Sequence, residues 1–228
     1  DSISASTPYD TSFYLQEPDQ HEGFQTIALQ SVVFSNSVYP FNTNNNTLIF
    51  QEDGVASDLT ATITPGVYTS SQFETELKTI LDAAGGNTYT VSYNTSTLKL
   101  TITTDGTSVK LMGTSTCLYE LGFTENTDTS FASPLTGTNV LRLDGSQYVK
   151  VVSSFYTENI SSDNQRVMAC IPLTSSVGSL LYYTPEELTF HRLQEDALQN
   201  ISLRLRDDRN RPFELPQNCP IQYTFILQ

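Results

Sequence analysis

The chain lacks several residue types on which common functions depend. Among its 228 residues there is no tryptophan, there are three cysteines and two histidines, and Lys and Arg together number eleven. Charged residues make up 16% of the chain, below the ~25% that is usual for soluble domains. No apolar run approaches the ~20 residues that a membrane-spanning helix needs, so we expect no membrane insertion.

The shortage of basic residues excludes one large class of partners. The net charge is −14, whereas a nucleic-acid surface needs clustered Lys and Arg to neutralise phosphates. We therefore expect no nucleic-acid partner, and we interpret the acidic surface as one that keeps the protein in solution. The chain begins at Asp1 rather than Met, and we expect it to be a trimmed or processed product.

The cysteines and histidines form no recognisable catalytic or metal-binding motif. Cys117, Cys170 and Cys219 are odd in number, far apart and without CxxC spacing, which is unlike a disulfide scaffold. Cys117 and Cys170 have apolar neighbours in the sequence, which predicts buried structural thiols and favours assembly in a reducing compartment. His21 and His191 lie outside any HExxH or HxH context. We expect no metal and no cofactor.

The paired carboxylates also lack a catalytic arrangement. Glu186–Glu187 and Asp207–Asp208 are adjacent in the sequence, and neighbours on a strand point to opposite faces. That is the wrong geometry for the two carboxylates of a glycosidase. The loop from Glu125 to Asp128 lacks the dense alternation of oxygen ligands that is typical of a calcium site. We predict no catalytic residues and interpret these carboxylates as turn or cap residues.

In place of charge the chain has Ser, Thr and Asn between short alternating segments, which is typical of β-rich proteins with many turns. Residues 201–206 and 221–227 alternate between apolar and polar, and residues 207–212 supply turn chemistry, which predicts two strands joined by a tight polar turn. Four arginines cluster there: Arg204, Arg206, Arg209 and Arg211. Two interpretations remain open, a solvated turn paired with the neighbouring aspartates and a salt-bridged contact with a neighbouring subunit.

Residues 60–123 have the pattern of a separate small module. Ser71 and Glu74 are spaced as a capping box, and the apolar residues that follow fall on one helical face. A glycine pair ends the predicted helix, and a hairpin over residues 89–102 follows. Because only one face of the helix is apolar, we expect the helix to pack on the hairpin.

The rest of the chain predicts about eight strands at turn-marked spacing, as in a sandwich or barrel. We predict an all-β fold, a single jelly-roll β-sandwich of residues 21–59 and 124–228, with residues 60–123 inserted as a helix-plus-hairpin (α+β) module. Residues 1–20 are polar with two prolines and are predicted to form an extended N-terminal arm. Residues 167–173 are almost continuously apolar, which predicts a central strand.

The order of motifs along residues 22–228 resembles a known protein family. The first group comprises the strand at 24–34, the turn and helix at 65–81, the hairpin that begins at 89, and Leu121-Gly-Phe123. The second group comprises residues 141–148, Ile171-Pro-Leu173, Leu181-Tyr-Tyr183 and residues 203–212. Together they resemble the penton, or minor capsid, proteins of virophages and polinton-like double-stranded DNA viruses.

This resemblance implies a structural virion protein rather than an enzyme. It implies a single jelly roll, five copies of which form a homopentamer at each five-fold vertex of an icosahedral capsid, assembled inside the infected host cell. The implied partners are further copies of the chain and the major capsid protein. Insertions project outward in such proteins, so residues 60–123 are the candidate part to bind a host surface receptor.

Two alternatives come from other functional classes. Jelly rolls also serve as lectins, so a glycan- or receptor-binding module such as a spike or fibre head is the first alternative, although the absence of tryptophan weighs against it. A sandwich-fold hydrolase is the second, and it is disfavoured because the sequence offers no catalytic set.

Overall fold

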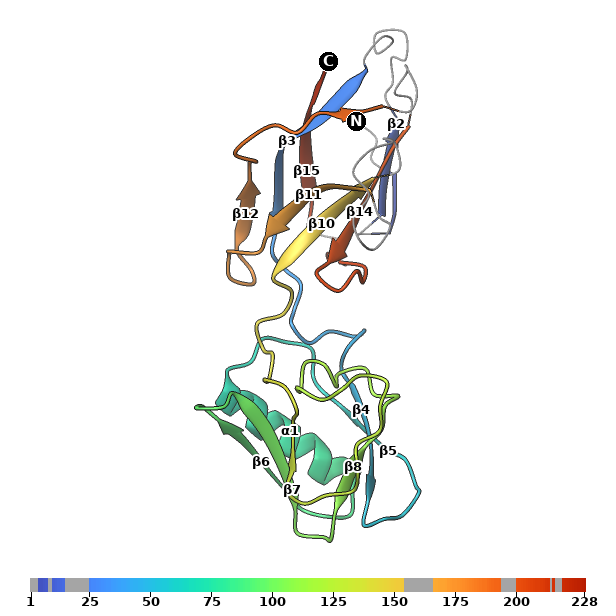
Figure 1. The fold of residues 1–228 in the computed structure, drawn as a ribbon, viewed down its shortest axis with the longest axis vertical. Helices are drawn as coiled ribbons and strands as arrows, with labels where there is room; N and C mark the ends of the chain where they lie inside the picture. Colours follow the sequence, from blue (N-terminus) through green and yellow to red (C-terminus); the bar gives the residue numbers. More distant parts are fainter. Residues whose placement is uncertain are drawn as a thin grey trace. The chain divides into compact units, whose positions relative to one another are not determined.

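The computed structural model describes residues 4–7, 10–14, 25–153, 166–193, 200–213, 215 and 219–228. Within these residues the chain is mostly strand with one helix, and it divides into two compact units (Figure 1). Unit 1 consists of residues 1–38 and 146–228, and unit 2 consists of residues 39–145. The predicted fold class, an all-β sandwich with an inserted helix-containing module, is confirmed.

Unit 1 is a sandwich of two antiparallel sheets. The first sheet runs in the order β1 (Ser4–Thr7), β2 (Asp10–Tyr14), β14 (Asn200–Asp207), β10 (Tyr148–Ser153) and β11 (Val167–Pro172). The second sheet comprises β3 (Thr26–Ser35), β12 (Leu180–Tyr183), β13 (His191–Arg192) and β15 (Ile221–Leu227). Because β15 pairs with β3 along residues 27–34, both β12 and β13 lie along the other side of β3.

The core of unit 1 lies between these two sheets, to which alternate residues of each strand contribute. Val149 and Val151 of β10 face inward together with Leu203 and Leu205 of β14, and all four are buried with the apolar residues of β3. The two faces close on each other as in a jelly-roll sandwich.

Two expectations for unit 1 need correction. The strands at the C-terminus form as predicted, but β14 and β15 belong to different sheets and do not pair. Alternation determines which face of a strand is apolar but not which strand lies beside it. Among the described strands, β11 lies at the end of its sheet rather than at the centre, and Cys170 and Pro172 on it are exposed.

The segment predicted as an N-terminal arm contributes strands to this sandwich. Residues 4–7 and 10–14 form β1 and β2, and β2 pairs with β14 over five residue pairs. These parts of the arm are therefore hydrogen-bonded members of the first sheet.

Unit 2 packs one helix against two three-stranded sheets. One sheet has the order β5 (Leu59–Thr62), β4 (Thr47–Glu52), β8 (Val109–Leu111), and the other has β6 (Tyr89–Asn94), β7 (Lys99–Thr104), β9 (Leu135–Thr136). Helix α1 (Ser70–Ala84) buries Phe73, Leu77 and Leu81 in a core shared by both sheets. Phe73 stacks on Phe41, with ring centroids 4.9 Å apart.

The unit extends beyond the predicted limits of 60–123. Strand β4 is the central strand of its sheet, and Phe41 and Leu141 are buried in the same core. The backbone of Gly145 lies so close to Pro40 that a Cβ added to the glycine would be 3.3 Å from Pro40 Cγ. The two ends of unit 2 therefore lie in contact with each other.

The helix begins with a different capping box from the predicted one. The Thr69 hydroxyl accepts a hydrogen bond from the Gln72 N–H at 3.3 Å, and Gln72 Oε1 accepts from the Thr69 N–H at 3.0 Å. Both pairs satisfy the spacing rule, since Gln can replace Glu at the third position. Glu74 instead accepts a hydrogen bond from the backbone N–H of Tyr93 and so ties the helix to the hairpin.

A carboxylate after β4 joins three segments of unit 2. Asp53 accepts hydrogen bonds from the Asn87 side chain at 3.0 Å, from the Ser108 N–H at 3.2 Å and from the Thr107 N–H at 2.7 Å. These donors favour the ionised form and lower the pKa of Asp53 to about 2. The carboxylate thereby links the end of β4 to the segment after α1 and to the turn before β8.

Candidate self-association surface

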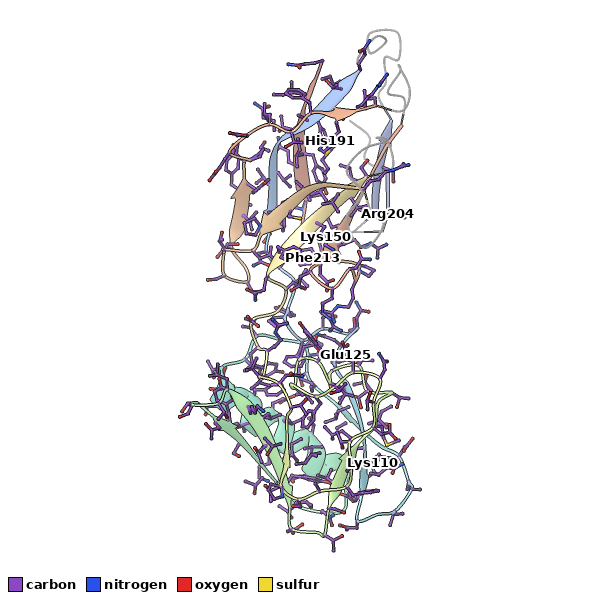
Figure 2. The ribbon with its side chains drawn as sticks, viewed as in Figure 1. Lys110, Glu125, Lys150, His191, Arg204 and Phe213 are labelled. Atoms are coloured by element: carbon purple, nitrogen blue, oxygen red, sulfur yellow. The ribbon has the colours of Figure 1, made fainter. Side chains whose placement is uncertain are left out.

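The two histidines are the residues considered first as possible metal ligands or catalytic groups. His21 lies outside the described residues, and His191 is 2% exposed on β13, opposite Ile27 of β3 (Figure 2). Over the part of the chain that the structure describes, no group of three or more His, Cys, Asp or Glu side chains is placed to hold a metal ion. His191 is thus a core residue of the sandwich.

The three cysteines occupy different environments. Cys117 is buried as predicted, and desolvation together with Glu120 raises the pKa of its thiol, which disfavours the thiolate that a nucleophile needs. Cys219 is half-buried and its sulfur lies 3.2 Å from the Ser37 hydroxyl. Cys170 was predicted to be buried, but it is exposed. Its apolar sequence neighbours face the core while Cys170 points outward, opposite Lys150 of β10.

The Asp207–Asp208 pair shapes a turn, as predicted. Asp207 is buried and its Oδ1 accepts hydrogen bonds from the backbone N–H of Arg209 at 3.0 Å and of Arg211 at 2.7 Å. Its Oδ2 accepts from Arg211 Nε at 2.7 Å, and Asp208 accepts from the Gln147 N–H at 3.3 Å. The two carboxylates hold separate parts of the backbone and do not converge.

The acidic loop of unit 2 also has a structural role. Asp128 accepts a hydrogen bond from the Gly113 N–H at 2.8 Å and pairs with Lys110 Nζ at 2.8 Å. The hydrogen bond and the lysine lower the pKa of Asp128. A lysine ammonium occupies the side of this carboxylate that a cation would need.

The arginines of the turn form part of a larger basic surface, which we define as Lys150, Arg204, Arg206, Arg209 and Arg211. Lys150 of β10 lies directly opposite Arg206 of β14. Arg204 lies two residue pairs further along the same two strands, opposite Val152 (Figure 2). Arg211 forms an ion pair with Asp207 of its own turn. For Arg211 the turn interpretation therefore holds.

An exposed apolar strip lies on the other sheet. Leu180 and Tyr182 of β12 are each 69% exposed, whereas Leu181 between them is 4% exposed. Leu188 and Phe190 follow in the connection to β13 and are also exposed. We call these four side chains the β12 edge. Because β12 and β13 both pair with β3 on the same side, the strip follows one border of the sheet.

Within the described residues β12 pairs with β3 alone, so its outer backbone edge is not covered by another strand of that part of the chain. A strand edge of this kind, with large apolar side chains beside it, is a template for contact with another chain. Glu186 and Glu187 lie in the same connection, and both are exposed. The β12 edge therefore combines apolar anchors with adjacent negative charge.

No protein-family model and no curated protein matches the chain. The crystal structure of the mavirus penton protein is similar at 11% sequence identity, covering 97% of this chain and 91% of that chain with a TM-score of 0.44.

The fold and the surface define the class of this protein from its own residues. It is a two-sheet jelly-roll sandwich that carries an inserted α+β unit and presents an apolar edge. In the described part of the chain no helix is long and apolar enough to cross a membrane.

Proposed function

We propose that the chain is a structural protein of a virion, a penton-type capsomer that forms homopentamers at the five-fold vertices of an icosahedral capsid. The observation that carries the proposal is the β12 edge, where two side chains that are 69% exposed lie on a border of the sandwich that no other described strand covers. Contiguous exposed apolar side chains mark sites of protein association. The order of sequence motifs along residues 22–228 supports the same role.

In this role the protein acts through the way its copies fit together in a ring. A cyclic ring is built from a head-to-tail contact, in which each copy uses two different surfaces. Sandwiches buried side against side in this way close into a ring, and the outer rim of the ring contacts the major capsid protein. The proposal requires no chemical step, cofactor or metal.

The proposal is tested by the oligomeric state. Light scattering on a sizing column gives the mass of the purified chain, first alone and then after mixing with the major capsid protein. We expect a pentamer, or a monomer that becomes five-fold when it is incorporated into shells. A chain that remains monomeric alone and is absent from assembled shells contradicts the proposal.

Unit 2 is the proposed receptor-facing part. It has its own buried core, and its two ends meet at Pro40 and Gly145, so it can be replaced by a short linker without cutting a sheet of unit 1. We expect particles that carry the shortened chain to assemble but to lose attachment to host cells. Unchanged attachment refutes this assignment.

One observation favours the glycan-binding alternative for unit 2. The outward side chains of the β6–β7 pair are mainly hydroxyls: Thr90 lies opposite Thr103, and Ser92 lies opposite Thr101. Such a face presents donors and acceptors to sugar hydroxyls. A glycan array probed with unit 2 tests this alternative, and binding that is lost on replacing Thr90 and Thr103 by valine supports it.

A further inference from the structure

We infer that unit 2 binds an acidic, N-acetylated sugar of the sialic-acid class on the outer face of the sheet formed by β6, β7 and β9. This inference rests on the proposed receptor-facing role of unit 2, and it names the ligand and the residues that hold it. Three observations carry it: an array of hydroxyl groups, a lysine beside that array, and an exposed leucine in a strained turn.

The outer face of this sheet consists mainly of hydroxyl groups. The register of the strands places them in two rows across the sheet: Thr90 with Thr103, and Ser92 with Thr101 and Thr136. We call these five residues the hydroxyl face. The residues that alternate with them are buried in the core of unit 2, so the hydroxyls point outward. Each hydroxyl both donates and accepts hydrogen bonds, which suits the hydroxyls of a sugar.

The charge on this face is unusual for unit 2. Residues 39–145 include eleven Asp and Glu but only four Lys and Arg. The strands β6, β7 and β9 nevertheless carry no carboxylate, and Lys99 is their one charged residue. Lys99 points to the same side as Thr101, because the two residues are two positions apart on one strand. The face therefore suits a ligand with neutral hydroxyls and a single negative charge.

Lys99 also differs from the other basic residues of unit 2. The other three each have an intramolecular partner: Lys78 pairs with Asp82, Lys110 with Asp128, and Arg142 lies over the ring of Tyr119. Among the residues that the structure describes, the Lys99 ammonium forms no ion pair and no hydrogen bond. A ligand carboxylate can form a charge-assisted hydrogen bond with Lys99 without displacing a partner inside the chain.

The turn before Lys99 exposes an apolar side chain in a strained conformation. Leu98 has a φ of 59° and is 46% exposed. The other described residues with positive φ are all Gly, Asn or Asp, which tolerate the left-handed region better than leucine does. The Leu98 carbonyl accepts a hydrogen bond from the Leu141 N–H at 2.8 Å, which brings the exposed Val140 close to Leu98. Strain of this kind clusters at functional sites, and burial in the core does not account for the leucine here.

These three features match three groups of one sugar. The carboxylate of a sialic acid pairs with Lys99, its hydroxyls bond to the hydroxyl face, and the methyl of its acetamido group packs against Leu98 and Val140. Neighbouring strands are about 4.8 Å apart, and alternate residues of one strand about 6.7 Å apart, so one sugar with its substituents reaches more than one row. An open face binds a single sugar weakly, and the five copies of a penton-type capsomer add avidity.

Sugar binding by the full chain tests the inference directly. Saturation-transfer NMR measures the binding of three methyl glycosides: those of N-acetylneuraminic acid, of glucuronic acid and of N-acetylglucosamine. The second lacks the acetamido group and the third lacks the carboxylate. We expect the first to bind more tightly than either of the others by about threefold or more. Binding of either of the others as tightly as the first, or no binding of the first, overturns the inference.

A lysine variant tests the role of the charge. We expect Lys99→Gln to weaken binding of the N-acetylneuraminic acid glycoside about threefold to tenfold, since the charge-assisted hydrogen bond is lost. Lys78→Gln is the matched control, because it removes the same charge from helix α1 of the same unit, and it leaves binding unchanged. Equal binding by Lys99→Gln and the original chain overturns the inference.

A turn variant separates binding from folding. Glycine adopts a positive φ without strain, so we expect unit 2 of Leu98→Gly to unfold at a temperature no lower than that of the original chain. The same variant binds the N-acetylneuraminic acid glycoside about threefold more weakly, because the apolar contact is lost. Val55→Gly is the control, since Val55 is 60% exposed in another turn, and it binds as the original chain does. Unchanged binding by Leu98→Gly overturns the inference.

Failure of the inference is distinguishable from failure of the proposed function, because the sugar measurements need no capsid. If the chain enters shells but does not bind the acidic sugar, the inference fails and the vertex role stands. If the chain binds the acidic sugar through Lys99 but neither forms pentamers nor enters shells, the vertex role fails and the sugar site stands.

Discussion

Replacing Leu180 and Tyr182, the two outward side chains of β12, by serine is expected to weaken self-association strongly while changing the free energy of unfolding little. Leu180 and Tyr182 are each 69% exposed, so most of their apolar surface already contacts water in the single copy. Complete burial of such a side chain is worth about 1.5–3 kcal/mol. With about a third of each side chain covered, each replacement costs the free energy of unfolding about 1 kcal/mol or less.

The expected effect on association is much larger. Truncating a large apolar or aromatic side chain near the centre of an interface reduces the free energy of association by about 1–2 kcal/mol. The double replacement Leu180→Ser with Tyr182→Ser therefore weakens each subunit contact by about 2–4 kcal/mol. That corresponds to an increase in the dissociation constant of roughly 30-fold to several hundred-fold.

The neighbouring residue on the same strand is the control. Leu181 is 4% exposed and faces the core, so Leu181→Ala costs about 2–5 kcal/mol of unfolding free energy. Denaturant unfolding measures the free energy of unfolding of each variant. Light scattering over a dilution series measures the dissociation constant of the subunit contact. Unchanged dissociation of the Leu180/Tyr182 double variant refutes the assignment of β12 to the contact. A fall in its stability comparable to that of Leu181→Ala contradicts the outward placement of these side chains.

Three further predictions concern unit 2 and are checked by its unfolding transition. Thr69→Ala lowers the stability of unit 2 by about 1 kcal/mol because the N-cap acceptor is lost. Ser71→Ala is the control and changes it by less than about 0.5 kcal/mol. A larger loss for Ser71→Ala than for Thr69→Ala contradicts the N-cap at Thr69. Phe73→Ala costs about 3–5 kcal/mol, since the ring is fully buried and stacked, and a loss below about 1 kcal/mol contradicts that packing. The folded pKa of Asp53 is about 2 against an ordinary 3.8, so the unfolded chain binds more protons in this range and stability falls as pH drops from 3.8 towards 2. Asp53→Asn flattens this part of the pH profile measured by thermal unfolding, and an unchanged slope rejects the assignment.

Much of the strand content follows from local alternation in the sequence. The segments at 201–206 and 221–227 alternate clearly, and both form strands. Their separation into two sheets depends on which strands pair over long sequence distances, and alternation does not predict that pairing. The limits of unit 2 were missed for the same reason, because the strand at 47–52 is recognisable alone but its partners lie on either side of the helix in sequence.

The candidate surface was harder to find from the sequence than the core. Residues 180–183 are all apolar or aromatic, and such a run is typical of a strand buried on both faces. Leu181 lies in the core between the two sheets, so Leu180 and Tyr182 point to the outer face of their sheet, where they are exposed. Cys170 is a parallel case, because its apolar neighbours suggested burial while its own side chain faces outward. In both cases the sequence does not tell which face of the sheet each side chain points to, nor that the outer face is exposed.

The contact between Pro40 and Gly145 also has a kinetic consequence. Strands β3 and β10 of unit 1 are separated by about a hundred residues, and closing a loop of that length costs about 2–3 kcal/mol more than closing one of about five. Once unit 2 has folded, its ends lie together and the long loop behaves as a short one. We therefore expect unit 2 to fold early and so to bring the two separated segments of unit 1 together, which allows their strands to pair.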